Sequence, residues 1–169
     1  MQKDTIPSES EAFNQAALLC SRSEHCASQI YEKLTRLGVP SEVQERVIAR
    51  LVDERFIDES RFARAYALDK LRYNHWGRVK IDQMLRMLDI SPADRQAALA
   101  ELPEDEYLDI LHRLVRQKRP SIQGRNDYEC RAKLARYLVG KGFEPSLCFR
   151  VLDFSPDALR TSDCTPKII

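Results

Sequence analysis

The sequence predicts an all-α protein built from three tandem three-helix repeats. Glycine is scarce, with 5 among 169 residues, and no segment shows the alternation of apolar and polar residues typical of strands. Apolar residues recur instead at helical spacing, and one such pattern occurs three times. A unit of about fifty residues cannot bury enough apolar area alone, so we expect the repeats to stack into an elongated, curved array.

The first repeat should contain three helices: residues 10–21, residues 23–38, and a third helix after Pro40. Apolar side chains form one face of each of these segments. Capping-box spacing occurs at two of the starts, Ser8 with Glu11 and Ser41 with Gln44.

The repeat register is set by Val39, Ile90 and Phe143, which are 51 and 53 residues apart. Apolar residues precede them by five and nine positions, small residues by thirteen, and good N-cap residues by sixteen. Prolines suited to a first helical turn follow. The corresponding sets are Leu34, Leu85 and Leu138; Ile30, Ile81 and Leu134; Cys26, Gly77 and Cys130; Ser23, Asn74 and Asp127; and Pro40, Pro92 and Pro145.

Each repeat also has a leading helix, expected over residues 10–21, 58–73 and 104–118. The predicted repeats are residues 1–56, 57–102 and 103–154. Residues 155–169 contain two prolines and little periodicity, so we expect a disordered tail.

Charge is abundant but nearly balanced, with 31% charged residues and a net charge of +1. Any electrostatic function must therefore arise from local distribution, and residues 55–86 carry eight basic against four acidic side chains. The chain has no apolar run long enough to span a membrane and no secretory signal at its start, so we expect a cytoplasmic protein. Five widely spaced cysteines and three histidines predict reduced thiols, no metal site and no cofactor.

On the helix after Asp58, Arg61, Arg64 and Arg72 share one stripe, while Phe62 and Tyr66 point toward the core. Arginine matches both carboxylates and phosphates, so the stripe is suited to an acidic protein face or to nucleic acid. It is equally suited to a solvated surface whose arginines pair with Asp58, Glu59 and Asp69.

Trp76 lies beside Arg78 and Lys80, where an aromatic side chain could stack on a base or anchor a protein interface. A core position or a wedge between repeats is the favoured interpretation. Gly77 indicates a place where helices approach closely, so a bulky residue there should displace Arg78 and Lys80.

The third repeat carries a second basic face, because basic residues alternate with apolar ones along residues 130–138. A solvated surface is again the alternative. Together the two faces give the candidate residues for binding a partner or nucleic acid: Arg61, Arg64, Lys70, Arg72, Trp76, Arg78, Lys80, Arg125, Arg131, Lys133 and Arg136. Residues with a structural role are expected to be Phe62, Tyr66, Gly77, Ile81, Leu85, Leu134 and Leu138.

No catalytic pattern surrounds His25, His75 or His112, and no glycine-rich loop precedes a helix, so we expect no enzyme activity. A three-helix unit is also compatible with a helix-turn-helix reader of DNA. Three close copies without dimer elements disfavour that interpretation.

Three segments resemble the RecX regulatory proteins, which modulate the bacterial recombinase RecA. They are FIDESRFARAY with Lys70 and WGRVK in the centre, SRSEHCASQIYEKLTRLG before it, and CRAKLARYLVGKGF after it. The resemblance covers roughly residues 12–153. It departs from the family at Gly140, Lys141 and Gly142, where a more arginine-rich segment is expected, and in the tail.

The resemblance implies three three-helix repeats and a role in DNA repair, recombination and the SOS response. It implies a monomer that binds the RecA filament on single-stranded DNA, lies in its groove or at its end, and inhibits it. The alternative is a sequence-nonspecific protein that binds single- or double-stranded DNA through the same basic faces. A helical scaffold for an unrelated partner is the third possibility.

Overall fold

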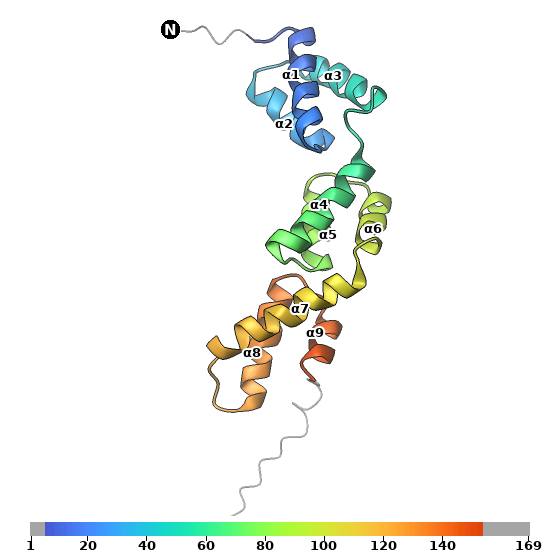
Figure 1. Ribbon diagram of the computed structural model, residues 1–169. Coiled ribbons are helices and arrows are strands. Elements are labelled where there is room, and N and C mark those ends of the chain that lie inside the picture. The colour runs from blue at the N-terminus through green and yellow to red at the C-terminus, as the bar shows by residue number, and fades with distance from the viewer. Residues whose placement is uncertain (1–5, 154–169) are drawn as a thin grey trace, which may run out of the picture. The chain divides into compact units, whose positions relative to one another are not determined.

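The computed structural model describes residues 6–153, and within that range all regular structure is helical, as predicted. Three successive groups of three α-helices follow one another along the chain (Figure 1). The helices are α1 (Glu9–Arg22), α2 (Ala27–Arg36), α3 (Ser41–Asp53), α4 (Glu59–Asn74), α5 (Arg78–Met87), α6 (Pro92–Ala100), α7 (Glu104–Lys118), α8 (Asp127–Gly140) and α9 (Pro145–Val151), with a short 3-10 helix at Arg119–Ser121.

The chain forms two compact units. Of the described residues, 6–74 and 81–102 make the first, while 75–80 and 103–153 make the second, so the division falls inside α5. The predicted repeat boundaries and the elongated, curved shape stay predictions, and the tail 155–169 lies outside the described residues. Among the described helices, none is both long and apolar enough to cross a membrane.

The repeated apolar positions are buried in every repeat. Leu34, Leu85 and Leu138 are at most 1% exposed, which is expected for the inward stripe of a middle helix. The sets at Ile30, Ile81 and Leu134 and at Val39, Ile90 and Phe143 are at most 4% exposed. The periodicity therefore corresponds to a shared core position in each repeat.

Each middle helix ends in the same left-handed turn. The residue before the register position has positive φ in all three repeats: 74° at Gly38, 60° at Asp89 and 92° at Gly142. The next N–H donates to a carbonyl five residues earlier, as in a Schellman cap: Val39 to Leu34 at 3.1 Å, Ile90 to Leu85 at 3.1 Å and Phe143 to Leu138 at 3.2 Å.

Helix starts match the predictions only in part. The capping box of Ser8 and Glu11 is present, with Ser8 N–H donating to the Glu11 carboxylate at 2.8 Å. The capping box of Ser41 and Gln44 is wrong, because Gln44 is buried and its amide donates to the Val39 carbonyl at 2.7 Å.

The predicted N-cap set is also wrong. Ser23 ends α1, Asn74 is the last residue of α4, and Asp127 is the first helical residue of α8, which Asn126 caps. The middle helices α2 and α5 begin about one turn later than expected because residues 23–26 and 75–77 form their own linkers. Only α8 begins near the predicted position.

In the first unit, the start of α2 contacts the left-handed turn of the second repeat. Ser28 Oγ donates to the Leu88 carbonyl at 2.9 Å. Glu59, the first residue of α4, accepts a hydrogen bond from the Ala27 N–H, while burial raises the pKa of Glu59. The two contacts join the middle helix of the first repeat to the second repeat.

In the second unit, the start of α5 makes the corresponding contact with the turn of the third repeat. Gly77 N–H donates to the Lys141 carbonyl at 2.9 Å, and Val79 N–H donates to the Gly142 carbonyl at 3.0 Å. Val79 aligns with Ser28, and Lys141 aligns with Leu88. A Cβ added to Gly77 would collide with the backbone of Gly142, so this contact requires glycine.

Replacing Gly77 with alanine should lower the free energy of unfolding by about 1–3 kcal/mol, because the new methyl group must displace backbone. Gly140→Ala is the matched control, since an added Cβ on this α8 glycine meets nothing within 4 Å. There alanine should raise stability by about 0.5–1 kcal/mol. Urea unfolding followed by circular dichroism measures both variants, and equal stability would contradict the close approach at Gly77.

Candidate partner-binding surface

Two arginines of the predicted central stripe form ion pairs with acidic residues outside α4. Arg61 Nε donates to Glu24 Oε1 at 2.6 Å, and Arg64 Nε donates to Glu101 Oε1 at 2.9 Å. Their side chains remain 45% and 47% exposed. Both partners differ from Asp58, Glu59 and Asp69, which the solvated-surface interpretation named, because sequence spacing reveals only partners nearby in the chain. Arg72 is exposed on the last turn of α4.

Two lysines of the predicted set lie over aromatic rings. Lys70 Nζ is 5.1 Å from the centre of the Tyr66 ring, and Lys80 Nζ is 4.5 Å from that of Trp76. Trp76 is half-buried, so only part of its surface remains accessible. Cation–π contacts of this kind orient a lysine near a ring without consuming its hydrogen-bond donors.

Arg78 is held inside the second unit. Its side chain is only 22% exposed, and its guanidinium lies 4.0 Å from the centre of the Tyr107 ring. It pairs with Glu104 at 2.6 Å and with Glu144 at 3.4 Å. Its predicted role in binding a partner stays a prediction, and these contacts favour a packing role.

Tyr107 connects this cluster. Its hydroxyl donates to Glu144 Oε2 at 2.6 Å and accepts the backbone N–H of Arg78 at 3.0 Å. Burial, followed by the hydrogen bond to Glu144, raises the pKa of Tyr107. Sequence reasoning missed Tyr107 and Glu144 because they lie 29 and 66 residues from Arg78, with no local signal linking them.

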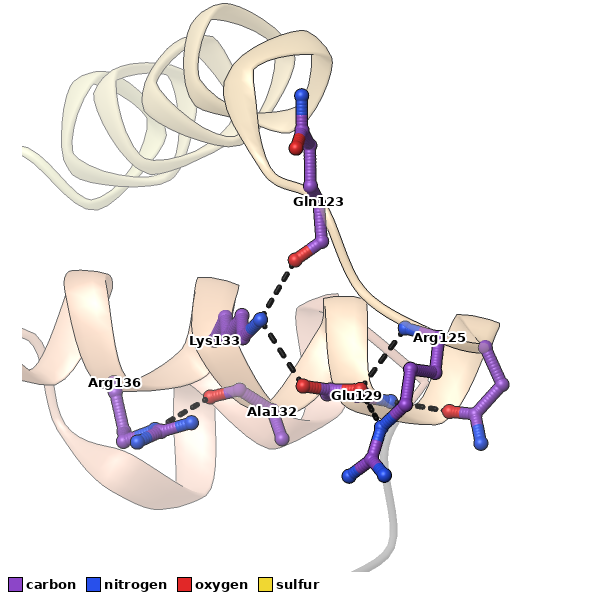
Figure 2. A network of polar contacts seen from close by, with 7 residues as sticks. Gln123, Arg125, Glu129, Ala132, Lys133 and Arg136 are labelled. Atoms are coloured by element: carbon purple, nitrogen blue, oxygen red, sulfur yellow. Dashed lines mark hydrogen bonds and ion pairs between the residues drawn. The ribbon is translucent and has the colours of Figure 1, made fainter.

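The second predicted basic face is organised by Glu129 on α8. Its carboxylate accepts the Arg125 N–H at 2.9 Å and Arg125 Nε at 3.2 Å, and it pairs with Lys133 Nζ at 3.0 Å. Lys133 Nζ also donates to the Gln123 carbonyl at 2.7 Å. Figure 2 shows the two basic side chains approaching Glu129 from opposite sides. We call Arg125, Glu129 and Lys133 the α8 cluster.

The local sequence explains this arrangement. Asn126 caps α8 because its side chain accepts the Glu129 N–H at 2.8 Å. In turn, the Glu129 carboxylate accepts the N–H of Arg125, which lies just before the helix. Glu129 and Lys133 are four residues apart on α8 and so share one side of the helix, whereas Arg125 reaches Glu129 from the segment just before the N-cap. These hydrogen bonds, that of the Arg125 N–H first, lower the pKa of Glu129 to about 2.

Arg131 and Arg136 flank the α8 cluster. Arg131 pairs with Asp127 at 2.8 Å and donates to the Asp153 carbonyl at 2.9 Å. Arg136 is exposed, and its Nε lies 3.5 Å from the Ala132 carbonyl. Arg131, Lys133 and Arg136 therefore all lie on α8, and Arg136 is the exposed one of these three.

The residues expected to have a structural role lie in or beside the core. Phe62, Ile81, Leu85, Leu134 and Leu138 are at most 4% exposed, and Gly77 is buried. Tyr66 is half-buried, with its ring 5.6 Å from that of Phe62.

Residues 6–153 contain no group of three or more histidine, cysteine, aspartate or glutamate side chains that could hold a metal ion. The four cysteines in this range are free thiols, and burial raises the pKa of Cys148 to about 11. Cys164 lies outside the described residues.

Three successive groups of three helices with a recurring buried register define a helical-repeat protein. Family models for the first, second and third three-helix domains of RecX match residues 12–51, 58–99 and 104–152. A protein of Halorhodospira halophila called "Regulatory protein RecX" is 31% identical over 137 residues, covering 79% of this chain and 82% of that protein. The chain belongs to the RecX family, which consists of regulatory proteins rather than enzymes.

Further comparisons agree on the fold. A RecX protein of Leuconostoc mesenteroides is 23% identical over 143 residues, covering 85% of this chain. The chain spans about half the length of that protein (54%) and of a RecX protein of Clostridium tetani (53%). A solved structure described as "Crystal structure of regulatory protein RecX" is similar with a TM-score of 0.77 and 21% identity, covering 86% of this chain and 72% of that one.

Tyr107→Phe should reduce the free energy of unfolding by about 1–3 kcal/mol, because it leaves the Arg78 N–H and the Glu144 carboxylate without the buried hydroxyl. Tyr73→Phe is the control, since Tyr73 is 79% exposed and should change stability by less than about 0.5 kcal/mol. Chemical denaturation of both variants tests the cluster. Losses of equal size would show that the Tyr107 hydroxyl has no special role.

Glu129→Gln should lower the melting temperature in a pH-dependent way. Because the folded state lowers the pKa of Glu129 from 4.5 to about 2, its contribution to stability is present above pH 4.5 and is lost as pH falls toward 2. The melting temperatures of the two proteins should therefore differ near neutral pH and converge in acid. A Glu129 carboxyl titration in the folded protein, followed by NMR, should have its midpoint well below 4.5; a midpoint near 4.5 would contradict the assignment.

Proposed function

We propose that this protein binds filaments of the recombinase RecA on single-stranded DNA and limits their activity. Membership of the RecX family carries this proposal, because the family resemblance names RecA as the partner. The contacts would come from the basic outer faces of the second and third repeats. A regulator of this kind works as a monomer in the cytoplasm, where the recombinase acts.

The mechanism is occupancy rather than chemistry. A chain that lies across neighbouring recombinase subunits blocks the growing filament end or the groove that receives homologous DNA. Several weak contacts along a repeating partner add through effective concentration, so no single contact has to be strong. Basic faces on successive repeats fit a partner whose surface repeats in the same way.

The ion pairs of the chain support a larger contribution from the third repeat. Arg61 and Arg64 would have to leave Glu24 and Glu101, which lie on other segments of the first unit, to contact a partner. Arg125, just before α8, is 92% exposed while it is bound to Glu129 in the first turn of that helix, so in this proposal it contacts a partner without breaking a contact between helices.

The second candidate function is sequence-nonspecific DNA binding through the same faces, and the exposed cations of α8 favour it. Titration of labelled DNA without recombinase, at several salt concentrations, separates the two functions. Tight binding that weakens by about 0.7–0.9 log units per log unit of salt for each neutralised phosphate supports direct DNA binding. Much tighter binding after RecA is added to the same DNA supports the filament as the main ligand.

Added in excess to RecA on single-stranded DNA, the protein should reduce both ATP hydrolysis and strand exchange. Unchanged rates at saturation would refute the proposed function. Arg136→Glu and Arg72→Glu should each raise the half-inhibitory concentration about five-fold or more, since an exposed pair contributes about 0.2–1 kcal/mol and charge reversal adds repulsion. Arg36→Glu is the matched control, because Arg36 is 68% exposed on the first repeat, outside the proposed faces. Circular dichroism confirms that each variant keeps its helicity.

A further inference from the structure

Helix α8 has an open hollow of about 550 Å³ on its outer face. Tyr128, Ala132 and Arg136 are spaced four residues apart, so they form one row with the smallest side chain between an aromatic ring and a guanidinium. The outer members lie eight residues apart, which is about 12 Å along a helix. We call this the α8 hollow; its lining residues are Arg125, Asn126, Tyr128, Glu129, Ala132 and Arg136.

The α8 cluster shares Arg125 and Glu129 with the α8 hollow and holds its cations in place through ion pairs. Glu129 binds Arg125 and Lys133 at 3.2 and 3.0 Å, so neither long side chain has to be ordered entirely by a ligand. Figure 2 shows Arg136 farther along the same helix, beside Ala132. Arg125, Lys133 and Arg136 together outweigh the single carboxylate of Glu129.

In the first two repeats, the residue aligned with Ala132 contacts the next repeat. Ala132 aligns with Ser28 and Val79, whose hydroxyl and N–H donate to carbonyls of a left-handed turn at 2.9 and 3.0 Å. Helix α8 begins about one turn earlier than α2 and α5 in the repeat register. Its N–H at Cys130 therefore donates to a carbonyl at the start of its own helix, that of Asn126, at 3.2 Å. Among the described residues, the face that joins repeats in α2 and α5 is therefore a basic hollow in α8.

We infer that the α8 hollow binds one nucleotide of single-stranded DNA, with the base over Ala132 against Tyr128 and the flanking phosphates on Arg125 and Arg136. Unstacked bases pack on aromatic rings and guanidinium planes, and the neighbouring cations match the backbone. Duplex DNA presents its phosphates but keeps its bases stacked, so it would leave the hollow unused. An acidic peptide would supply carboxylates without a ring for Tyr128.

This inference deepens the proposed function, because the strand inside the recombinase filament is the DNA that the hollow would meet. It assigns the third repeat to the nucleic acid and leaves the recombinase surface to the remaining basic residues. The protein then holds filament DNA and filament protein with different parts of one chain.

The test measures binding of the full chain to fluorescein-labelled oligothymidine by fluorescence anisotropy, without recombinase. Tyr128→Ala should weaken binding about ten-fold or more, whereas Tyr128→Phe should retain it, because the ring supplies the stacking. Ala132→Leu should also weaken binding by filling the hollow without changing charge. Tyr73→Ala, which removes a ring that is 79% exposed on α4, is the matched control and should bind as the wild type does.

Salt dependence and competing ligands complete the test. Arg136→Ala should reduce the salt slope by about 0.7, whereas Tyr128→Ala should leave it unchanged. Equal affinity for a hairpin duplex, preference for a labelled polyglutamate peptide, or unaltered binding by Tyr128→Ala and Ala132→Leu would each overturn the inference. If these variants lose oligothymidine binding while the wild type leaves RecA activity unchanged, the inference stands and the proposed function fails. If the wild type inhibits RecA fully but binds no oligothymidine, the proposed function stands and the inference fails.

Discussion

The structure depends on one joint that occurs twice: the first turn of a middle helix rests on the left-handed turn that ends the next middle helix in the chain. The first N–H groups of a helix have no acceptor within it, and a small repeat cannot bury its apolar face alone. The joint provides acceptors for groups at the helix start and covers part of each repeat, and it does both with the same residues. Where Gly77 and Val79 donate to Lys141 and Gly142, the neighbouring N–H of Arg78 is accepted by Tyr107.

The two joints explain why aligned positions of the first and second joint carry different types of residue. In the first, the contact is made by the Ser28 hydroxyl, so Cys26 and Asp89 can both carry side chains at the junction. In the second, backbone meets backbone, and the aligned positions are Gly77 and Gly142. Glycine is thus required at these two positions by close approach, and at position 142 also by its positive φ of 92°.

The sequence predicted what local periodicity determines. The burial of Leu34, Leu85 and Leu138 follows from a helical stripe, and the leading helix α7 has the predicted bounds. The starts of α2 and α5 could not be predicted, because their first N–H groups or side chains bond to residues about sixty positions later rather than to a local cap. The sequence identified the candidate basic residues but not the carboxylates that pair with them. Glu24 and Glu101 are each 37 residues from the arginine that they bind.

These partners change how the basic residues should be interpreted. Each of Arg61, Arg64, Arg78, Arg125, Arg131 and Lys133 pairs with a carboxylate, so the position of that carboxylate is more informative than its presence. An arginine paired with another segment, such as Arg61 or Arg78, stabilises the packing, and recruiting it to a partner would weaken the fold. A cation paired with the adjoining turn of the chain, such as Arg125 with Glu129, does not link separate helices, and its side chain stays 92% exposed. The predicted second and third repeats hold six and seven arginines, so they differ less in the number of these cations than in the residues that pair with them.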